Sequence, residues 1–167
     1  MISGPRITSM EEKLLAGRQL EMSYARNRTV ELWTTFMPRR RHFKNSVSDH
    51  LYSLQVYPDA NFFRDFDPTR TFVKWALIEV RDFDNLPEGM EPFVLSAGAY
   101  AVFDFRGASS EAAAAFQYIY GVWLPASRYE LDDRPHFELL GDKYRREDAQ
   151  SEEEIWIPIR PALSLLS

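Results

Sequence analysis

Apolar and polar residues alternate with a period of two near the C-terminal end, over residues 152–159. Three isoleucines share one face of this segment, and the other face carries Glu154, Trp156 and Pro158. Strict alternation of this kind predicts a half-buried strand whose isoleucines face a core. Glu154 and Trp156 then lie side by side on the opposite face, about 7 Å apart along the strand.

A carboxylate beside an indole is a candidate site for a flat, apolar cation. The ring can stack on such a molecule while the carboxylate supplies the counter-charge. The structural alternative is an ordinary surface glutamate, Glu154, next to a partly buried tryptophan, Trp156. Both interpretations are open from this segment alone.

The remaining apolar pattern predicts five more strands and two helices. The strands are expected at residues 13–24, 50–57, 72–80, 93–107 and 136–144. The pattern changes to the helical period over residues 28–43, where Pro38 should kink or end the helix. A second helix is expected from a serine cap at Ser109 or Ser110 to a stop at Pro125.

These elements follow the order strand, helix, strand, strand, and the order then repeats. Trp75 and Trp156 occupy the same place in the two halves. We therefore predict an α+β fold of two duplicated strand-helix-strand-strand units, about residues 12–82 and 90–161. Two units related by a pseudo-twofold would share an antiparallel sheet, with a ligand cleft at the pseudo-twofold junction.

The duplication also strengthens the interpretation of Glu154 as a site residue. When Trp75 is aligned with Trp156, Val73 falls opposite Glu154. The first unit is therefore hydrophobic where the second has a carboxylate. This difference favours a single asymmetric site on the second unit.

The predicted domain is flanked by short segments. Residues 1–11 have little periodicity and are expected to form a flexible leader, followed by one domain over 12–161 and a tail over 162–167. The connection at 58–71 is too long for a tight hairpin and contains three phenylalanines. We expect it to fold over something apolar, as a lid.

Composition narrows the class of protein. Apolar residues make up 45% of the chain, enough for a core, and the net charge of −5 does not suggest a nucleic-acid-binding surface. The chain has no cysteine, which excludes disulfides and thiolate metal sites. No apolar run is long enough to span a membrane, and no signal peptide is evident, so we expect a cytoplasmic protein without membrane contact.

The usual motifs of metal, phosphate and acyl chemistry are absent. The three histidines show no metal-ligand spacing, and His50 and His136, which fall at matching repeat positions, are expected to be structural. There is no glycine-rich phosphate loop and no nucleophile elbow. No metal and no cofactor are predicted.

The order of these motifs resembles the GyrI-like effector-binding domain, which also occurs at the C-terminus of AraC-type and MerR-type multidrug-responsive regulators. The resemblance rests on the paired units, on the phrase at 97–103 before a capped helix, and on the phrase at 154–159. It covers roughly residues 12–161. A stand-alone member is implied, because residues 1–12 are too short for a helix-turn-helix. Direct DNA binding is therefore not expected.

The resemblance implies a cleft between the units that binds lipophilic or aromatic cations. In such domains an acidic residue deep in the pocket faces the cation, and Glu154 is the position onto which we carry this role. The aromatic residues assigned to the pocket are Trp33, Tyr120, Trp123 and Trp156. The implied function is that of a small-molecule sensor or sequestering protein linked to transcription regulation or drug response.

Two further functions stay open. Some relatives are hydrolases, and Glu154 with Tyr120 would form a pair for acid–base catalysis in a desolvated pocket. Alternatively, the chain inhibits a protein partner, in the manner of a DNA gyrase inhibitor. Either sheet edge would also allow a homodimer.

Overall fold

The structure is a computed structural model that describes residues 1–163. The described strands are β1 (Ile2–Met10), β2 (Lys13–Ser23), β3 (Ser46–Val56), β4 (Thr71–Val80), β5 (Glu91–Leu95), β6 (Gly98–Arg106), β7 (Tyr129–Leu131), β8 (His136–Leu140) and β9 (Glu152–Pro161). The helical segments are α1 (Thr29–Phe36), η1 (Met37–His42), η2 (Ser109–Glu111), α2 (Ala112–Tyr118), η3 (Ile119–Trp123) and α3 (Leu124–Ala126). Of the predicted tail, residues 164–167 lie outside the described part.

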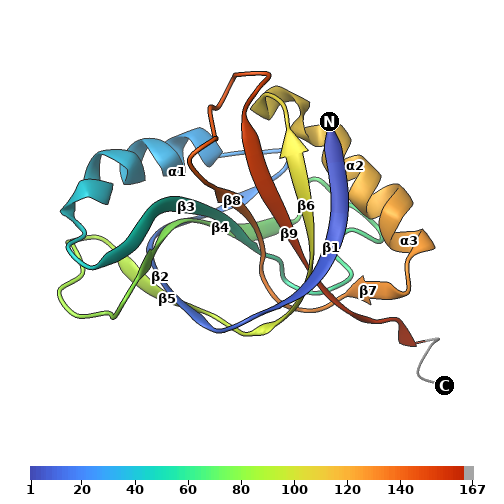
Figure 1. Cartoon of the computed structure of the whole chain (residues 1–167), viewed down its shortest axis with the longest axis horizontal. Coiled ribbons are helices and arrows are strands. Elements are labelled where there is room, and N and C mark those ends of the chain that lie inside the picture. Colours follow the sequence, from blue (N-terminus) through green and yellow to red (C-terminus); the bar gives the residue numbers. More distant parts are fainter. Residues whose placement is uncertain (164–167) are drawn as a thin grey trace.

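One antiparallel sheet joins the strands in the order β1-β6-β9-β8-β3-β4-β2-β5, and β7 pairs with β9 at its end. From the β3–β8 contact outward, each half reads as the second, third and first strand of one unit. This order confirms the α+β fold of two duplicated strand-helix-strand-strand units. Figure 1 shows α1 and α2 over different halves of the sheet.

The register at the centre makes the pseudo-twofold explicit. Leu54 on β3 lies opposite Phe137 on β8. Leu54 also lies opposite Trp75, and Phe137 lies opposite Trp156. One row across four strands therefore reads Trp–Leu–Phe–Trp. The predicted equivalence of Trp75 and Trp156 follows from this row.

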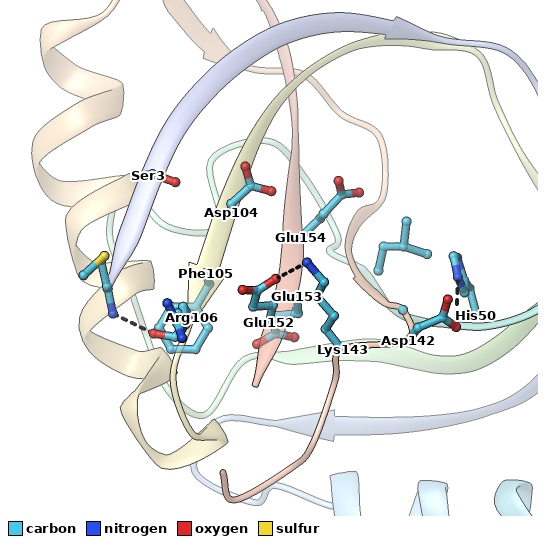
Figure 2. A pocket seen from close by; sticks show the side chains of 13 residues that line it. Ser3, His50, Asp104, Phe105, Arg106, Asp142, Lys143, Glu152, Glu153 and Glu154 are labelled. Carbon is cyan, nitrogen blue, oxygen red and sulfur yellow. Dashed lines mark hydrogen bonds and ion pairs between the residues drawn. The ribbon is translucent and has the colours of Figure 1, made fainter. Parts of the chain in front are cut away.

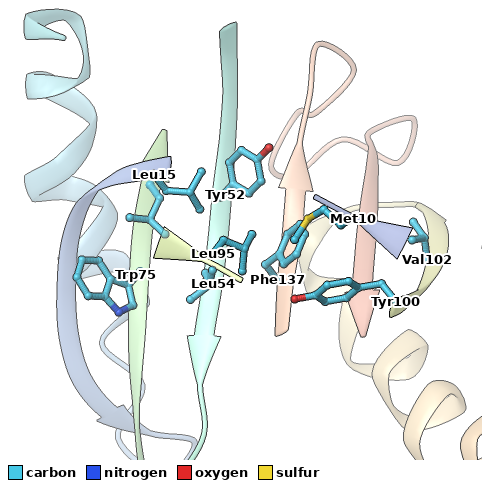
Figure 3. Close-up of a cluster of buried hydrophobic side chains, with 10 residues drawn as sticks. Met10, Leu15, Tyr52, Leu54, Trp75, Leu95, Tyr100, Val102 and Phe137 are labelled. Atoms are coloured by element: carbon cyan, nitrogen blue, oxygen red, sulfur yellow. The ribbon is translucent and has the colours of Figure 1, made fainter. Parts of the chain in front are cut away.

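The two faces of the sheet have separate cores. On the helix side, Leu32 and Phe36 of α1 pack on β2 and β4, while Ala115 and Ile119 pack on β6 and β9. On the opposite face, a cluster of large side chains takes in Trp75, Tyr100 and Phe137. Met10 of β1 and Leu95 of β5, at opposite ends of the strand order, join this same cluster. The sheet therefore curls until its two edges share a core (Figure 3).

Three local predictions were wrong. The leader over residues 1–11 is not flexible, because residues 2–10 form β1 and pair with β6. An edge strand needs hydrogen bonds on one side only, so it tolerates Pro5 and a polar outer face that hides the pattern. The predicted strand 93–107 is broken at residues 96–97 into β5 and β6, and β7 forms in a segment for which no strand was predicted.

The predicted match of His50 with His136 is also wrong. His136 precedes Phe137 as Ser53 precedes Leu54, so Ser53 is its counterpart in the first unit. His50 lies in an irregularity of β3 between Ser46 and Leu51. Loop insertions of this kind shift offsets along the chain, and strand pairing is needed to resolve them.

Gly17 on β2 has no room for a side chain. A Cβ atom at this position would overlap the carbonyl oxygen of Ala76 on the neighbouring strand. We expect Gly17→Ala to lower the free energy of unfolding by roughly 1–3 kcal/mol, measured by chemical denaturation, because the backbone of β4 must move. Gly121→Ala is the matched control, since nothing lies within 4 Å of its added Cβ. Equal stability of the two variants would contradict this account.

Candidate functional site

A cleft of about 620 Å³ opens on the helix side of the sheet where the two units meet. Its walls include Thr29 at the start of α1 and Tyr120 on η3, and its floor includes Gln55 on β3 and Glu138 on β8. The cleft therefore lies at the pseudo-twofold junction. Both repeats contribute to it, because β3 and β8 are adjacent at the centre of the sheet.

Aromatic rings line one wall of the cleft in nearly parallel orientation. Phe63, from the loop between β3 and β4, stacks on Tyr120 with ring centroids 4.3 Å apart and an interplanar angle of 11°. Phe66 lies parallel to Phe63 at 6.1 Å, and Phe116 lies parallel to Tyr120 at 6.5 Å. This series presents flat apolar faces, to which an aromatic molecule can stack.

A second group of aromatic residues closes the other side. The hydroxyls of Tyr24 and Tyr57 are 2.7 Å apart, and burial raises the pKa of Tyr24 to about 12. Phe62 lies beneath them in a small core with Phe72. The predicted lid loop thus divides its phenylalanines: Phe62 is buried in this core, whereas Phe63 and Phe66 line the cleft.

Tyr120 is held in place by a hydrogen bond to His136. Its hydroxyl oxygen lies 2.8 Å from Nδ1 of the imidazole. Burial, reinforced by the positive charge of Arg134, lowers the pKa of His136 to about 3, so the ring is neutral at physiological pH. In a neutral imidazole Nδ1 either accepts a hydrogen bond from the tyrosine hydroxyl or donates one to it, depending on the tautomer, and in both cases the bond fixes the phenol ring against the cleft.

Two carboxyl groups lie at or near the floor, and both hold their protons unusually tightly. Burial raises the pKa of Glu138 to about 7, although Lys74 and a hydrogen bond from Gln55 act in the opposite direction. Burial, with repulsion from Glu138, raises the pKa of Glu153 to about 8. The hydrogen-bond network orients the Gln55 amide so that its nitrogen donates to Glu138 Oε2 at 3.1 Å. The floor is therefore close to its titration point at neutral pH.

Lys74 on β4 also lines the cleft. Its ammonium nitrogen donates to Thr29 Oγ1 at 3.3 Å. Burial lowers the pKa of Lys74, and the nearby Glu138 and Glu153 offset part of this effect. No sequence pattern singles out Lys74, because a single lysine in an apolar strand resembles a solvated edge position.

The predicted site residues are divided by the sheet. Tyr120 lines the cleft. Glu154 does not: it accepts hydrogen bonds from Arg6 at 2.7 Å and from the indole of Trp156 at 3.1 Å. The reason is strand alternation, since Ile155 and Ile157 face α2 and direct their neighbours to the opposite side.

The predicted tryptophans have mainly packing roles. Trp156 borders the cleft, but its ring stacks on Phe137 within the core of the opposite face, with centroids 5.2 Å apart. Trp33 packs edge-on against its helix neighbour Phe36, and Trp123 packs edge-on against Phe103. Neither Trp33 nor Trp123 is among the described residues that line the cleft.

Glu154 lines a second cavity, of about 600 Å³, on the other side of the sheet (Figure 2). Several charged side chains line this cavity, and some of them are already paired. Lys143 lies 3.4 Å from Glu152, and His50 lies 3.6 Å from Asp142. Within residues 1–163 no cluster of three or more histidine or acidic side chains is arranged to hold a metal ion.

Glu138 stands out in the sequence only when the register between β3 and β8 is known. It follows Phe137 as Gln55 follows Leu54, so the second unit has a carboxylate where the first has an amide. Lys74 precedes Trp75 as Ile155 precedes Trp156. Both charged positions therefore break the internal symmetry inside the cleft.

Comparison with known proteins identifies the family. Residues 4–160 match the family described as the GyrI-like small molecule binding domain, and the chain belongs to this family. It is 29% identical over 131 residues to the transcriptional regulator BrlR of Pseudomonas aeruginosa. This match covers 77% of the chain but 45% of BrlR, so the chain spans about half the length of that relative.

Two solved structures share the fold. The EcmrR C-terminal domain matches with a TM-score of 0.67 and 14% identity, over 95% of this chain and 98% of that one. SAV2435, solved bound to tetraphenylphosphonium, matches with a TM-score of 0.64 and 14% identity, over 95% of this chain and 94% of that one. No helix in the described part of the chain is long and apolar enough to cross a membrane.

The raised pKa of Glu153 makes stability fall as pH rises. The folded state keeps a proton up to about pH 8, whereas the unfolded chain releases it near 4.5, so unfolding is favoured progressively between these values. We expect Glu153→Gln to remove this part of the slope. Above pH 8 the variant should be more stable by roughly 1–2 kcal/mol, less than the full shift implies because the cleft admits water.

The measurement is urea denaturation of wild type and variant across this pH range. Glu12→Gln, at an exposed glutamate outside the cleft, is the matched control. Parallel stability curves for wild type and Glu153→Gln would show that Glu153 is ionised at neutral pH in the folded protein.

Proposed function

We propose that the chain binds lipophilic or aromatic organic cations in the cleft between its two units, with Glu138 as the counter-charge. The observation that carries this proposal is a carboxyl group in the floor of an aromatic cleft, with its pKa raised by burial to about 7. Such a group is destabilised as an anion when the cleft is empty. A bound cation would relieve this cost by supplying the missing charge.

The balance of charges at the floor supports a cationic ligand. When both Glu138 and Glu153 are ionised, Lys74 neutralises one of them and a net charge of −1 remains. The parallel rings of Phe63 and Tyr120 offer the apolar surface. Cations of low hydration, with charge spread over an aromatic framework, fit both requirements.

The comparisons with known proteins support a small-molecule ligand. The family is one of small-molecule binding domains. SAV2435, which shares the fold, is bound to tetraphenylphosphonium in its own structure. BrlR is a transcriptional regulator. We infer that this chain serves as a sensor or sequestering module for such cations, in a role related to regulation or drug response.

Glu138→Gln should weaken the binding of tetraphenylphosphonium. Removing the counter-charge from a desolvated site is expected to cost roughly 2 kcal/mol, which is about thirtyfold in Kd. Glu154→Gln is the matched control, because Glu154 lies on the opposite face and is paired with Arg6. Isothermal titration would measure all three proteins. A larger loss of affinity for Glu154→Gln than for Glu138→Gln would show that the counter-charge is Glu154 on β9 and not Glu138.

Affinity for the same cation should rise between about pH 6 and about pH 8. Glu138 and Glu153 hold protons in the empty cleft over this range and must release them before they can face a cation. Titration in two buffers of different ionisation enthalpy would count the released protons. Binding with no proton release at neutral pH, at an affinity independent of pH, would contradict this mechanism.

A further inference from the structure

Lys74 differs from the other three lysines of the chain in its surroundings. Lys13 and Lys143 each lie 3.4 Å from a glutamate, and Lys44 is exposed. Within residues 1–163 no carboxylate oxygen lies within 4.0 Å of Lys74 Nζ, whose recorded partner is the hydroxyl of Thr29. An amine in an apolar cleft without a contacting anion is poorly stabilised as an ammonium ion.

The position of Lys74 also makes its nitrogen available to a molecule in the cleft. Lys74 lines the cavity that contains the parallel rings of Phe63, Tyr120 and Phe116. A flat aromatic molecule stacked on these rings would share the cavity with the amine. Burial lowers the pKa of Lys74, so more of the amine is neutral and nucleophilic than in an exposed lysine.

We propose that Lys74 is a reactive amine that forms a reversible Schiff base with aromatic aldehydes entering the cleft. Nothing else in the proposed binding function requires this chemistry. The geometry that supports it is an amine without an ion pair, open to an aromatic cavity, with two carboxyl groups nearby.

The reaction balances with the groups present. The Lys74 nitrogen attacks the aldehyde carbon and the C=O π bond breaks. The nitrogen loses one proton and the oxygen gains one, which gives a neutral carbinolamine. The C–O bond then breaks and water leaves with a second proton, while the nitrogen lone pair forms the C=N bond. In sum, a neutral amine, an aldehyde and a carboxylic acid give an iminium, a carboxylate and water.

Glu138 is placed to supply that proton. Its carboxyl group is partly protonated at neutral pH, which suits a general acid at the dehydration step. Once deprotonated, it faces the positive iminium across the floor of the cleft. Glu153, whose pKa is also raised, lines the neighbouring cavity and lies close enough to Glu138 to repel its charge.

Reductive trapping tests the proposal. The intact chain is incubated with naphthaldehyde and sodium cyanoborohydride near neutral pH, and peptide mapping by mass spectrometry locates the reduced adducts. We expect Lys74 to be labelled severalfold faster than Lys13, Lys44 or Lys143, because burial lowers its pKa and so enlarges the neutral, nucleophilic fraction of the amine. Propanal, which cannot stack on the rings, should show a smaller preference.

Two variants complete the design. Lys74→Arg keeps the positive charge and should abolish the fast adduct, whereas Lys44→Arg should leave it unchanged. Labelling of the four lysines in order of their exposure, or an unchanged fast adduct in Lys74→Arg, would overturn the proposal. Peptide mapping of the labelled wild-type protein alone shows whether the four lysines react in order of their exposure. The proposal therefore stays testable if a variant does not fold.

The Schiff-base proposal and the cation-binding proposal can be refuted independently of each other. The labelling is measured without any organic cation, so a negative titration with tetraphenylphosphonium leaves it unaffected. If both hold, excess tetraphenylphosphonium should protect Lys74 from naphthaldehyde while leaving Lys44 labelling unchanged. Labelling of Lys74 that persists in saturating cation would show that the cation binds elsewhere, which would contradict the cation proposal and leave the Schiff-base proposal standing.

Discussion

The pairing of β3 with β8 is the contact on which the rest of the molecule depends. It places Leu54 opposite Phe137 and so aligns the two units about a pseudo-twofold. Because strand side chains alternate, this register also decides which residues face the helices and which face the other core. A shift of one residue would exchange Glu138 with Phe137, placing an aromatic ring at the cleft floor and a carboxyl group in the core.

Much of the architecture was predictable from local pattern. Alternation and helical period located most of β2, β4, β8 and β9 and both helix regions, and the repeated order of elements gave the duplicated α+β fold. These features are set by residues close together in the chain. The edge strand β1 was missed for a related reason: much of its outer face is polar, and Gly4 and Pro5 interrupt its pattern.

The candidate site was harder to predict from the sequence, because it depends on which face of the sheet carries the cleft. Glu154 was predicted because an acidic residue is present in one unit and absent from the other, and the floor of the cleft contains a difference of that kind. The sequence comparison of the two units paired Glu154 with Val73. The equivalent positions that face the cleft are instead Glu138 and Gln55. The direction of each strand face follows from where α1 and α2 pack, and that information is not local.

The charges of the cleft connect its two proposed activities. In an empty cleft, burial penalises the charged forms of Glu138, Glu153 and Lys74. A bound aromatic cation offsets this cost for the two carboxyl groups, because it adds a positive charge that the carboxylates can face. An aryl iminium formed on Lys74 is itself a lipophilic aromatic cation, joined to the protein by a covalent bond. The same floor therefore stabilises both, and a carboxyl group suited to bind the one is suited to promote formation of the other.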